Sequence, residues 1–202
     1  MPRTPNAARA WQRGAGTLLI ALGAALLLAA GTSAARAMLA RDLARARWAE
    51  IEAERAAAGG RLAAKKAARE GIARGTPVAR LLVSRLDLDE VIVEGVGDVE
   101  LYAGPGHMIG SALPGERGNS VVSAHRDRHF RSLGEVVVGD TIRTESDAGD
   151  VVWTVMRVRV VSANTPVLRS SRTPLLTLTT CWPIRYFGSA PDRLIVEAVP
   201  IG

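Results

Sequence analysis

The sequence predicts an all-β domain that follows an apolar membrane helix and a helical stalk. Three observations support this fold class. The 22 residues between Arg13 and Arg36 carry no charge, and the residues after them are rich in Ala, Arg and Glu. From Thr76 onward, short apolar or alternating runs are separated by Gly, Pro, Asn and Asp, which is typical of strands and turns. The predicted parts are a cytoplasmic tail over 1–13, a membrane helix over 14–35, a stalk over 36–75 and a β domain over 76–202.

The uncharged segment has the length of a membrane-spanning helix. At about 1.5 Å per residue it would extend roughly 33 Å, which is enough to cross the hydrocarbon core of a bilayer. A cleaved signal peptide is the alternative, because the apolar centre from Leu18 to Ala30 is short and Ala35-Arg36-Ala37 resembles a cleavage site. We expect a single-pass anchor, because the uncharged stretch continues to Ala35.

The orientation of this anchor follows from size more than from charge. Arg3, Arg9 and Arg13 favour a cytoplasmic N-terminus, but arginines also flank the other end of the segment. The 13-residue tail is too short to hold a domain, so the bulk of the chain lies on the far side of the membrane. We expect that side to be extracytoplasmic, with the lipid bilayer as one partner.

The segment after the membrane helix is predicted to be a helical spacer. Ala and Arg are strong helix formers, and the apolar stripe of the segment is thin. Gly59-Gly60 is expected to break the helix, and residues 71–77 to end it. A coiled coil is a weaker possibility, because no sustained heptad is visible.

The β domain is predicted to be a barrel or a sandwich of seven or eight strands. No strong helical pattern interrupts the runs, and about 125 residues suit one hydrophobic core. The strand-like runs are Val78–Val83, Leu88–Val93, Asn119–Ala124, Thr141–Thr144, Val151–Val161, Leu175–Thr180 and Leu194–Val199. We expect a fragment that begins at residue 76 to fold on its own.

Charge and cysteine content exclude several functions. Residues 1–75 carry a net charge of +8, whereas residues 76–202 carry −2, so the β domain is not expected to bind nucleic acid. One Cys and three His leave no set of ligands for a disulfide scaffold or a structural zinc site, and no cofactor is expected. Calcium binding by Asp87, Asp89, Glu90 and Glu94 is an alternative to an acidic strand edge, but no spaced ligand loop is present.

The chemistry of the domain is predicted to centre on Cys181. A lone Cys is most often a small buried hydrophobe, but Cys181 stands where the run Leu176–Thr180 gives way to a Trp-Pro loop. A strand end beside a loop is a position for a nucleophile, and a thiolate needs a nearby base or positive charge. The candidates for that partner are His107, His125, His129, Arg185 and Arg193.

Position favours His125 among the three histidines. His125 ends the apolar run Val121–Ala124, as Cys181 ends its own run. His107 lies in a glycine-rich turn and His129 in an arginine-rich loop, so both are expected to matter less. The His-Arg-Asp triplet that begins at His125 does not indicate a kinase, since the chain has no phosphate-binding glycine loop and no domain of kinase size.

Three separated motifs resemble those of the sortase family. Residues 177–181, Thr-Leu-Thr-Thr-Cys, resemble the sortase Thr-Leu-x-Thr-Cys signature, and residues 123–126, Ser-Ala-His-Arg, resemble the family's histidine strand. Residues 190–196 resemble its last element, in which an Arg precedes an apolar strand. The run His125–Phe130 and the Cys-Trp-Pro-Ile loop look most like the subgroup of Gram-negative bacteria, with actinobacterial class E second.

The resemblance implies an eight-stranded closed β-barrel and a cysteine transpeptidase. Cys181 would attack the Thr carbonyl of a C-terminal Leu-Pro-x-Thr-Gly-like motif in a secreted protein, and an amine of the cell envelope would resolve the thioacyl intermediate. His125 would be the general acid and base, and Arg193, favoured over Arg185, would stabilise the oxyanion. Thr180 and Trp182 are the further candidates for oxyanion or substrate binding. The domain would lie outside the cytoplasm, in the periplasm of a Gram-negative cell.

A binding protein and another class of transpeptidase are the two alternatives to a sortase. A catalytically idle barrel could bind peptide or cell-wall polymer, and it would leave Cys181 unreactive until the protein unfolds. L,D-transpeptidases also use a single Cys, but their Ser-x-Gly-Cys pattern is absent from the sequence.

Overall fold

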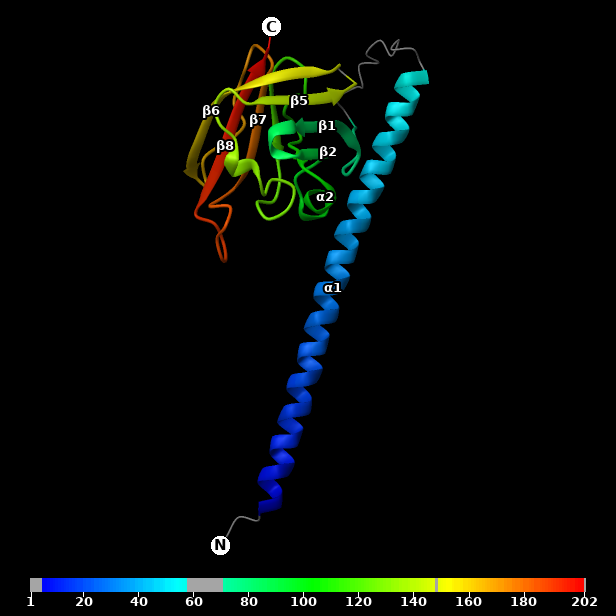
Figure 1. Ribbon diagram of the computed structural model, residues 1–202, viewed down its shortest axis with the longest axis vertical. Coiled ribbons are helices and arrows are strands. Elements are labelled where there is room, and N and C mark those ends of the chain that lie inside the picture. The colour runs from blue at the N-terminus through cyan, green and yellow to red at the C-terminus, as the bar shows by residue number, and fades with distance from the viewer. Residues whose placement is uncertain (1–4, 58–70, 148, 202) are drawn as a thin grey trace. The chain divides into compact units, whose positions relative to one another are not determined.

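The computed structural model describes residues 5–57, 71–147 and 149–201, and the chain divides into two compact units, 1–39 and 40–202 (Figure 1). The helices are α1 (Pro5–Ala57) and α2 (Asp98–Ala103), with 3₁₀ turns at Ser84–Leu86 and Leu133–Glu135. The strands are β1 (Pro77–Val83), β2 (Leu88–Glu94), β3 (Gly106–His107), β4 (Asn119–Ser123), β5 (Thr141–Ser146), β6 (Val151–Ser162), β7 (Leu175–Trp182) and β8 (Asp192–Pro200).

The first unit is the N-terminal part of α1. Its large apolar side chains are exposed, and they are Leu18, Leu19, Ile20, Leu22, Leu26, Leu27, Leu28, Met38 and Leu39. By length and composition this helix could cross a membrane, and a signal sequence near an N-terminus would have the same properties. The helix break expected at Gly59-Gly60 lies outside the described residues.

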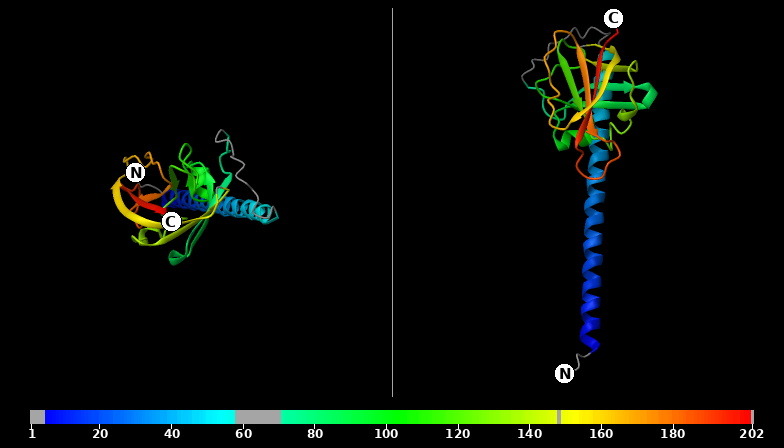
Figure 2. Two further views of the ribbon diagram at one scale, coloured as in Figure 1. Left: turned by 90° about the horizontal axis from the view of Figure 1, so that it is seen from above. Right: turned by 90° about the vertical axis from the view of Figure 1, so that its left-hand side faces the viewer.

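The second unit contains a closed β-barrel, which confirms the predicted eight-stranded fold. The strands follow the order β1-β2-β3-β4-β7-β8-β6-β5, and β5 pairs with β1 to close the barrel. The β2–β3 and β4–β7 pairs are parallel, and the others are antiparallel. Figure 2 shows β7 and β8, in orange and red, side by side in the barrel wall.

The barrel interior holds the main hydrophobic core. On β1, buried and half-buried residues alternate, because successive side chains of a strand point to opposite faces. Ala79, Leu81 and Val83 point inward, and Trp153 of β6 is fully buried among them with its indole N–H donating to Thr144 at 2.8 Å. The continuous burial of β7 from Leu175 to Thr180 shows that this strand is covered on both faces.

Two short elements differ from the sequence analysis. Strand β3 has only two residues, which is too short for any alternating pattern to reveal. Helix α2 has six residues, although no helix was expected inside the β domain. Its N-cap is Gly97, and Asp98 and Glu100 stand in its first turn, where acidic side chains interact favourably with the helix dipole.

The second unit also includes residues 40–57 of α1. Ala44 and Trp48 are buried against Val91 and Val93 of β2, with the half-buried Ile51 beside them. Trp48 is only 3% exposed, and its indole N–H donates to Glu52 at 2.9 Å. Part of the segment that the sequence predicted to be a spacer therefore packs against the barrel.

Candidate active site

The end of β4 places His125 beside the end of β7. Strands β4 and β7 are parallel, with Ser123 opposite Thr179. The pairing continues past the last residue of β4, because the Ala124 N–H donates to the Thr179 carbonyl at 3.2 Å. The Thr180 hydroxyl donates to the Ala124 carbonyl at 2.7 Å. These two bonds fix the backbone from which the half-buried His125 projects.

The end of β7 places Cys181 opposite Arg193. The two residues are direct partners in the antiparallel β7–β8 pair, so their side chains share one face of the sheet. Cys181 is a free, exposed thiol, and Arg193 is half-buried. Arg185, the rival arginine, lies in the exposed part of the loop between the two strands.

Strand alternation puts His125, Cys181 and Arg193 on the outer face of the barrel wall. Ala124 and Leu194, each adjacent in sequence to one of these residues, belong to the core inside the barrel. Since neighbouring side chains in a strand point in opposite directions, Arg193 points outward. The β4–β7 pairing continues through Ala124, and the same alternation carried one residue further directs His125 outward. Cys181 shares the face of Arg193. The structure therefore gathers the three residues that the sequence singled out onto the outer face of three adjacent strand ends.

An apolar patch lies on the same outer face. Val121 of β4 and Ile195 of β8 are buried there together with Val167 of the β6–β7 loop. Met108 and Val161 are half-buried against them. The β6–β7 loop thus covers part of the outer face of β4 and β8 through Val167.

Helix α2 contributes an aromatic neighbour to His125. The Tyr102 and His125 ring centroids are 5.8 Å apart, with the planes tilted by 51°. The Arg128 guanidinium lies over the Tyr102 ring, 4.6 Å from its centroid. No sequence signal pointed to Tyr102, because its element, α2, was not predicted.

Arg126 organises the loop that follows Cys181. Its guanidinium donates to the carbonyls of Pro183, Tyr186 and Gly188 at 3.2, 3.0 and 2.6 Å. It also lies 5.6 Å from the Tyr186 ring centroid. One side chain from the loop after β4 therefore holds most of the β7–β8 loop. Sequence analysis missed this role, and the only available signal was the position of Arg126 directly after His125.

Thr180 and Trp182, the two further predicted site residues, have partners of their own. Thr180 is buried, and its hydroxyl is committed to the Ala124 carbonyl. Trp182 is half-buried and packs against the barrel core. A Cβ on Gly134 would come within 3.1 Å of the Trp182 ring and 3.0 Å of Ile184, so the 3₁₀ turn at 133–135 lies against the start of the loop after Cys181.

His107 is not the turn residue that the sequence suggested, whereas His129 lies in the predicted loop but is buried. His107 belongs to β3 and is 2% exposed, with Nδ1 2.7 Å from Glu94 Oε2. His129 is 8% exposed, with Nδ1 3.2 Å from Glu90 Oε2. Both rings are buried against carboxylates, because a buried polar ring needs partners to offset the loss of water. Neither has the half-exposed position of His125 at a strand end.

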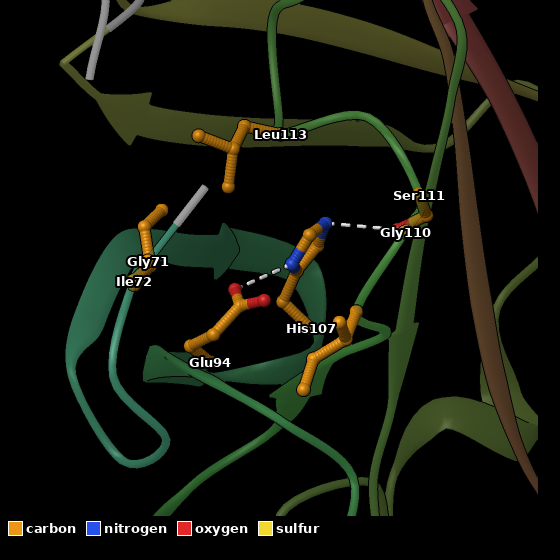
Figure 3. A pocket seen from close by; sticks show the side chains of 8 residues that line it. Gly71, Ile72, Glu94, His107, Gly110, Ser111 and Leu113 are labelled. Atoms are coloured by element: carbon orange, nitrogen blue, oxygen red, sulfur yellow. Dashed lines mark hydrogen bonds and ion pairs between the residues drawn. The ribbon is translucent and has the colours of Figure 1, made fainter. Parts of the chain in front are cut away.

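His107 forms a second polar cluster with Glu94 and Ser111, which lines a cavity of about 190 Å³. Figure 3 shows Glu94 and Ser111 hydrogen-bonded to the two ring nitrogens of His107. The arrangement of Ser111, His107 and Glu94 resembles a nucleophile with its base. The donors and acceptors of their hydrogen bonds do not fit that role for Ser111. His107 Nε2 lies 2.8 Å from the Ala112 carbonyl, so it carries a hydrogen, and the Ser111 hydroxyl donates to the Met108 carbonyl at 2.7 Å.

Three of the four acidic residues near β2, Asp89, Glu90 and Glu94, are engaged with basic side chains. Asp89 accepts two bonds from Arg80, at 2.8 and 2.7 Å, and the Arg80 guanidinium holds the pKa of Asp89 below its ordinary value. Glu90 is paired with Arg41 and His129. Within residues 5–57, 71–147 and 149–201, no group of three or more His, Cys, Asp and Glu side chains is arranged to hold a metal.

Comparisons with known proteins agree with this arrangement. A family model described as the Sortase domain matches residues 81–201, more than half of the chain. Sortase D of Bacillus subtilis (strain 168) is 34% identical over 119 residues, which cover 57% of this chain and 60% of that protein. The match therefore spans less than two thirds of the relative's length.

Solved structures show the same barrel. The Sortase D5 transpeptidase of Clostridium perfringens superposes with a TM-score of 0.60 at 26% identity, covering 71% of this chain and 93% of that one. Sortase A from Corynebacterium diphtheriae superposes with a TM-score of 0.57 at 26% identity, covering 64% and 62%. These relatives do not assign the chain to the Gram-negative-type subgroup or to class E. The family match over residues 81–201 and the barrel shared with these structures establish that the chain belongs to the sortase family, whose members are cysteine transpeptidases.

Proposed function

We propose that this chain is a membrane-anchored transpeptidase with Cys181 as its nucleophile, His125 as its general acid and base, and Arg193 as the stabiliser of the oxyanion. The proposal rests on the register of strands β4, β7 and β8 in the barrel wall. The β4–β7 pairing leads to His125 beside the end of β7, and the β7–β8 pairing puts Arg193 directly opposite Cys181. A nucleophile, a proton carrier and a cation on one face of adjacent strands are the groups that acyl transfer requires.

In the first half-reaction, the Cys181 thiolate attacks the Thr carbonyl carbon of a Leu-Pro-x-Thr-Gly-like motif near the C-terminus of a secreted protein. A C–S bond forms, and the carbonyl oxygen becomes an oxyanion that the Arg193 guanidinium stabilises. The C–N bond to the following Gly then breaks, and His125 gives its proton to the leaving amine. The products are a thioacyl-enzyme and the released C-terminal fragment.

In the second half-reaction, an amine of a cell-envelope component attacks the thioacyl carbon. His125, now without its proton, takes one from the incoming amine. The C–S bond breaks, a new amide forms, and Cys181 leaves as the thiolate from which the cycle began. The exposed position of Cys181 supports this function, because both the peptide and the amine must reach the sulfur.

Thr180 and Trp182 act in this proposal by positioning the site. The Thr180 hydroxyl, bound to the Ala124 carbonyl, ties the ends of β4 and β7 together one residue before His125 and Cys181. Trp182 packs on the core immediately after Cys181. These two contacts fix the distance between Cys181 and His125. The rate of a reaction that needs both groups depends strongly on that distance.

The anchor and the subgroup belong to the same proposal. The exposed leucines of α1 support a single-pass anchor in a bilayer, with residues 1–13 in the cytoplasm and the barrel outside it. The run His125–Phe130 and the loop Cys181–Ile184 support the Gram-negative-type subgroup, in which the barrel would face the periplasm.

Trapping of the acyl-enzyme tests the function. The full chain in detergent is incubated with Leu-Pro-x-Thr-Gly peptides varied at each position, with hydroxylamine as a small amine, and Cys181 is examined by mass spectrometry. We expect a thioacyl adduct on Cys181 and a peptide hydroxamate as product. An idle barrel that only binds peptide would give neither, and its Cys181 would not react with a small electrophile faster than a model thiol.

A further inference from the structure

A buried carboxylate links α1 to the loop that begins at His125. Glu90 lies on β2 and is 7% exposed. Its Oε1 accepts from Arg41 of α1, with 2.6 Å between Nη2 and Oε1. Its Oε2 lies 3.2 Å from Nδ1 of His129. One carboxylate therefore joins a side chain from the helix to a side chain from the loop. Because the carboxylate is buried, the loss of either partner leaves part of its charge uncompensated.

His129 is tied to His125 by two routes. The His125 carbonyl accepts from the N–H groups of Arg128 and Phe130, at 3.3 and 3.2 Å, so the residues on both sides of His129 are fixed to it. The other ring nitrogen of His129, Nε2, lies 3.4 Å from the carbonyl of Tyr102, whose ring stands beside the ring of His125. A displacement of His129 would therefore act on His125 through the turn and through Tyr102.

The helix side of this connection is itself fixed. Trp48, two turns after Arg41, is buried against Val91 and Val93 of the same strand that carries Glu90. Arg45, between them, donates to the Asp89 carbonyl of β2 at 3.1 Å. The Arg41 side chain is 40% exposed, so its removal leaves no cavity in the core.

We propose that Arg41, acting through Glu90 and His129, is a positioning residue that holds His125 in place for catalysis, so that residues 40–57 of α1 are part of the working enzyme. This inference rests on the proposed function of His125. Arg41 touches neither substrate nor the reacting atoms. Its loss leaves Glu90 with one partner, and the pair Glu90–His129 then relaxes together with the turn that starts at His125. The proton transfer slows, because small misplacements of a catalytic group are costly.

Kinetics of three variants in the detergent-solubilised full chain test the proposal. For Arg41→Ala we expect kcat for peptide cleavage to fall by about tenfold with KM unchanged. The alkylation rate of Cys181 should not change, because the nucleophile is not involved. Arg41→Lys should restore most of kcat, since a single N–O contact does not need the guanidinium fork. Arg45→Ala, the matched control on the same helix, should retain full kcat.

Hydrogen exchange provides a readout that does not depend on activity. In Arg41→Ala, the peptide covering residues 125–133 should exchange several-fold faster, whereas peptides from β7 and β8 should not change. Arg45→Ala should leave all of them unchanged. Unchanged exchange at 125–133 in Arg41→Ala would overturn the proposal, and so would equal losses in Arg41→Ala and Arg45→Ala, which would indicate general docking of the helix. If the wild-type chain cleaves no peptide, the proposed function fails, while the exchange measurement still decides the role of Arg41.

Discussion

Cys181 and Arg193 face each other across β7 and β8, as direct partners in an antiparallel pair. In such a pair the Cβ atoms are about 5 Å apart, so in the proposed reaction the guanidinium would reach the carbonyl that the sulfur attacks. Arg185, in the exposed loop, has no such fixed relation to the sulfur. The role of Arg193 therefore depends on the shape of its side chain as well as on its charge.

Replacement of Arg193 by Lys should be severe although the charge is kept. A guanidinium directs two donors to one region, whereas an ammonium acts as a point charge, and loss of one oxyanion donor costs on the order of 100-fold in rate. We expect Arg193→Lys to lower kcat/KM for peptide cleavage by about that factor. Arg185→Lys, the matched control in the adjacent loop, should keep near-full activity, and the reverse result would reassign the arginine.

Replacement of Arg126 should release the loop after Cys181. In Arg126→Ala three carbonyls lose their donor, and in Arg126→Lys one nitrogen replaces the two that donate to them. We expect faster hydrogen exchange over residues 183–190 and a loss in kcat/KM of roughly tenfold for the alanine variant, with a smaller loss for lysine. Arg185→Ala serves as the control. Unchanged exchange in Arg126→Ala would show that the loop does not depend on this side chain.

Replacement of Trp48 should destabilise the second unit. Trp48 is 3% exposed against Val91 and Val93, and truncation of a buried Trp costs about 3 kcal/mol or more. We expect a clear decrease in the melting temperature of Trp48→Ala, measured by circular dichroism, and little change in Leu43→Ala, whose side chain is exposed on the same helix. For the same reason a fragment beginning at residue 40 should melt higher than one beginning at residue 76. Equal melting temperatures of the two fragments would show that residues 40–57 do not stabilise the barrel and act only as a spacer.

Asp140 should contribute stability that depends on pH. Its carboxylate accepts from Arg85, at 2.8 and 2.5 Å, and from the Val137 N–H at 2.9 Å. The bond from Arg85 is the main reason that the pKa of Asp140 lies below its ordinary value of 3.8. A lowered pKa in the folded state gives stability that is complete above the unfolded pKa and is lost as the pH falls through the folded pKa.

We therefore expect Asp140→Asn to lower the free energy of unfolding by about 1 kcal/mol at pH 7, because the Arg85 side chain is half exposed and the pair is screened. The difference from wild type should shrink as the pH falls below about 4. Denaturant unfolding at pH 7 and pH 3 measures both values, with the exposed Asp147→Asn as a control. A difference that is independent of pH would contradict the assignment.

Seven of the eight barrel strands were predictable because each of these seven has a local signal in the sequence. The seven runs identified in the sequence correspond to β1, β2, β4, β5, β6, β7 and β8 within two residues at each end. Strand β3 and helix α2 have two and six residues, and their conformations are set by neighbours rather than by a periodic pattern. The closed order of the strands followed from the family resemblance, since no local pattern specifies parallel pairs such as β4–β7.

The candidate site was predictable only where residues end a strand. His125 and Cys181 each follow an apolar run, and Arg193 precedes one, so motif and position agreed. The burial of His107 and His129 could not be inferred, because their carboxylate partners come from another element, β2. Arg126 and Tyr102 were missed for the same reason, since long-range contacts define their roles.

In the proposed acyl transfer, Cys181 and His125 have separate duties, which the reactions of single variants can distinguish. Peptide cleavage, amine transfer and alkylation by a small electrophile are measured in the wild-type chain and its Cys181→Ala, Cys181→Ser and His125→Ala variants. Cys181→Ala should abolish cleavage and transfer, and Cys181→Ser should do nearly the same, because a hydroxyl ionises far less readily than a thiol. His125→Ala should lose cleavage while its thiol still reacts with the electrophile, since the proton donor is absent and the nucleophile is intact. Full cleavage by Cys181→Ala, or by His125→Ala, would contradict the account.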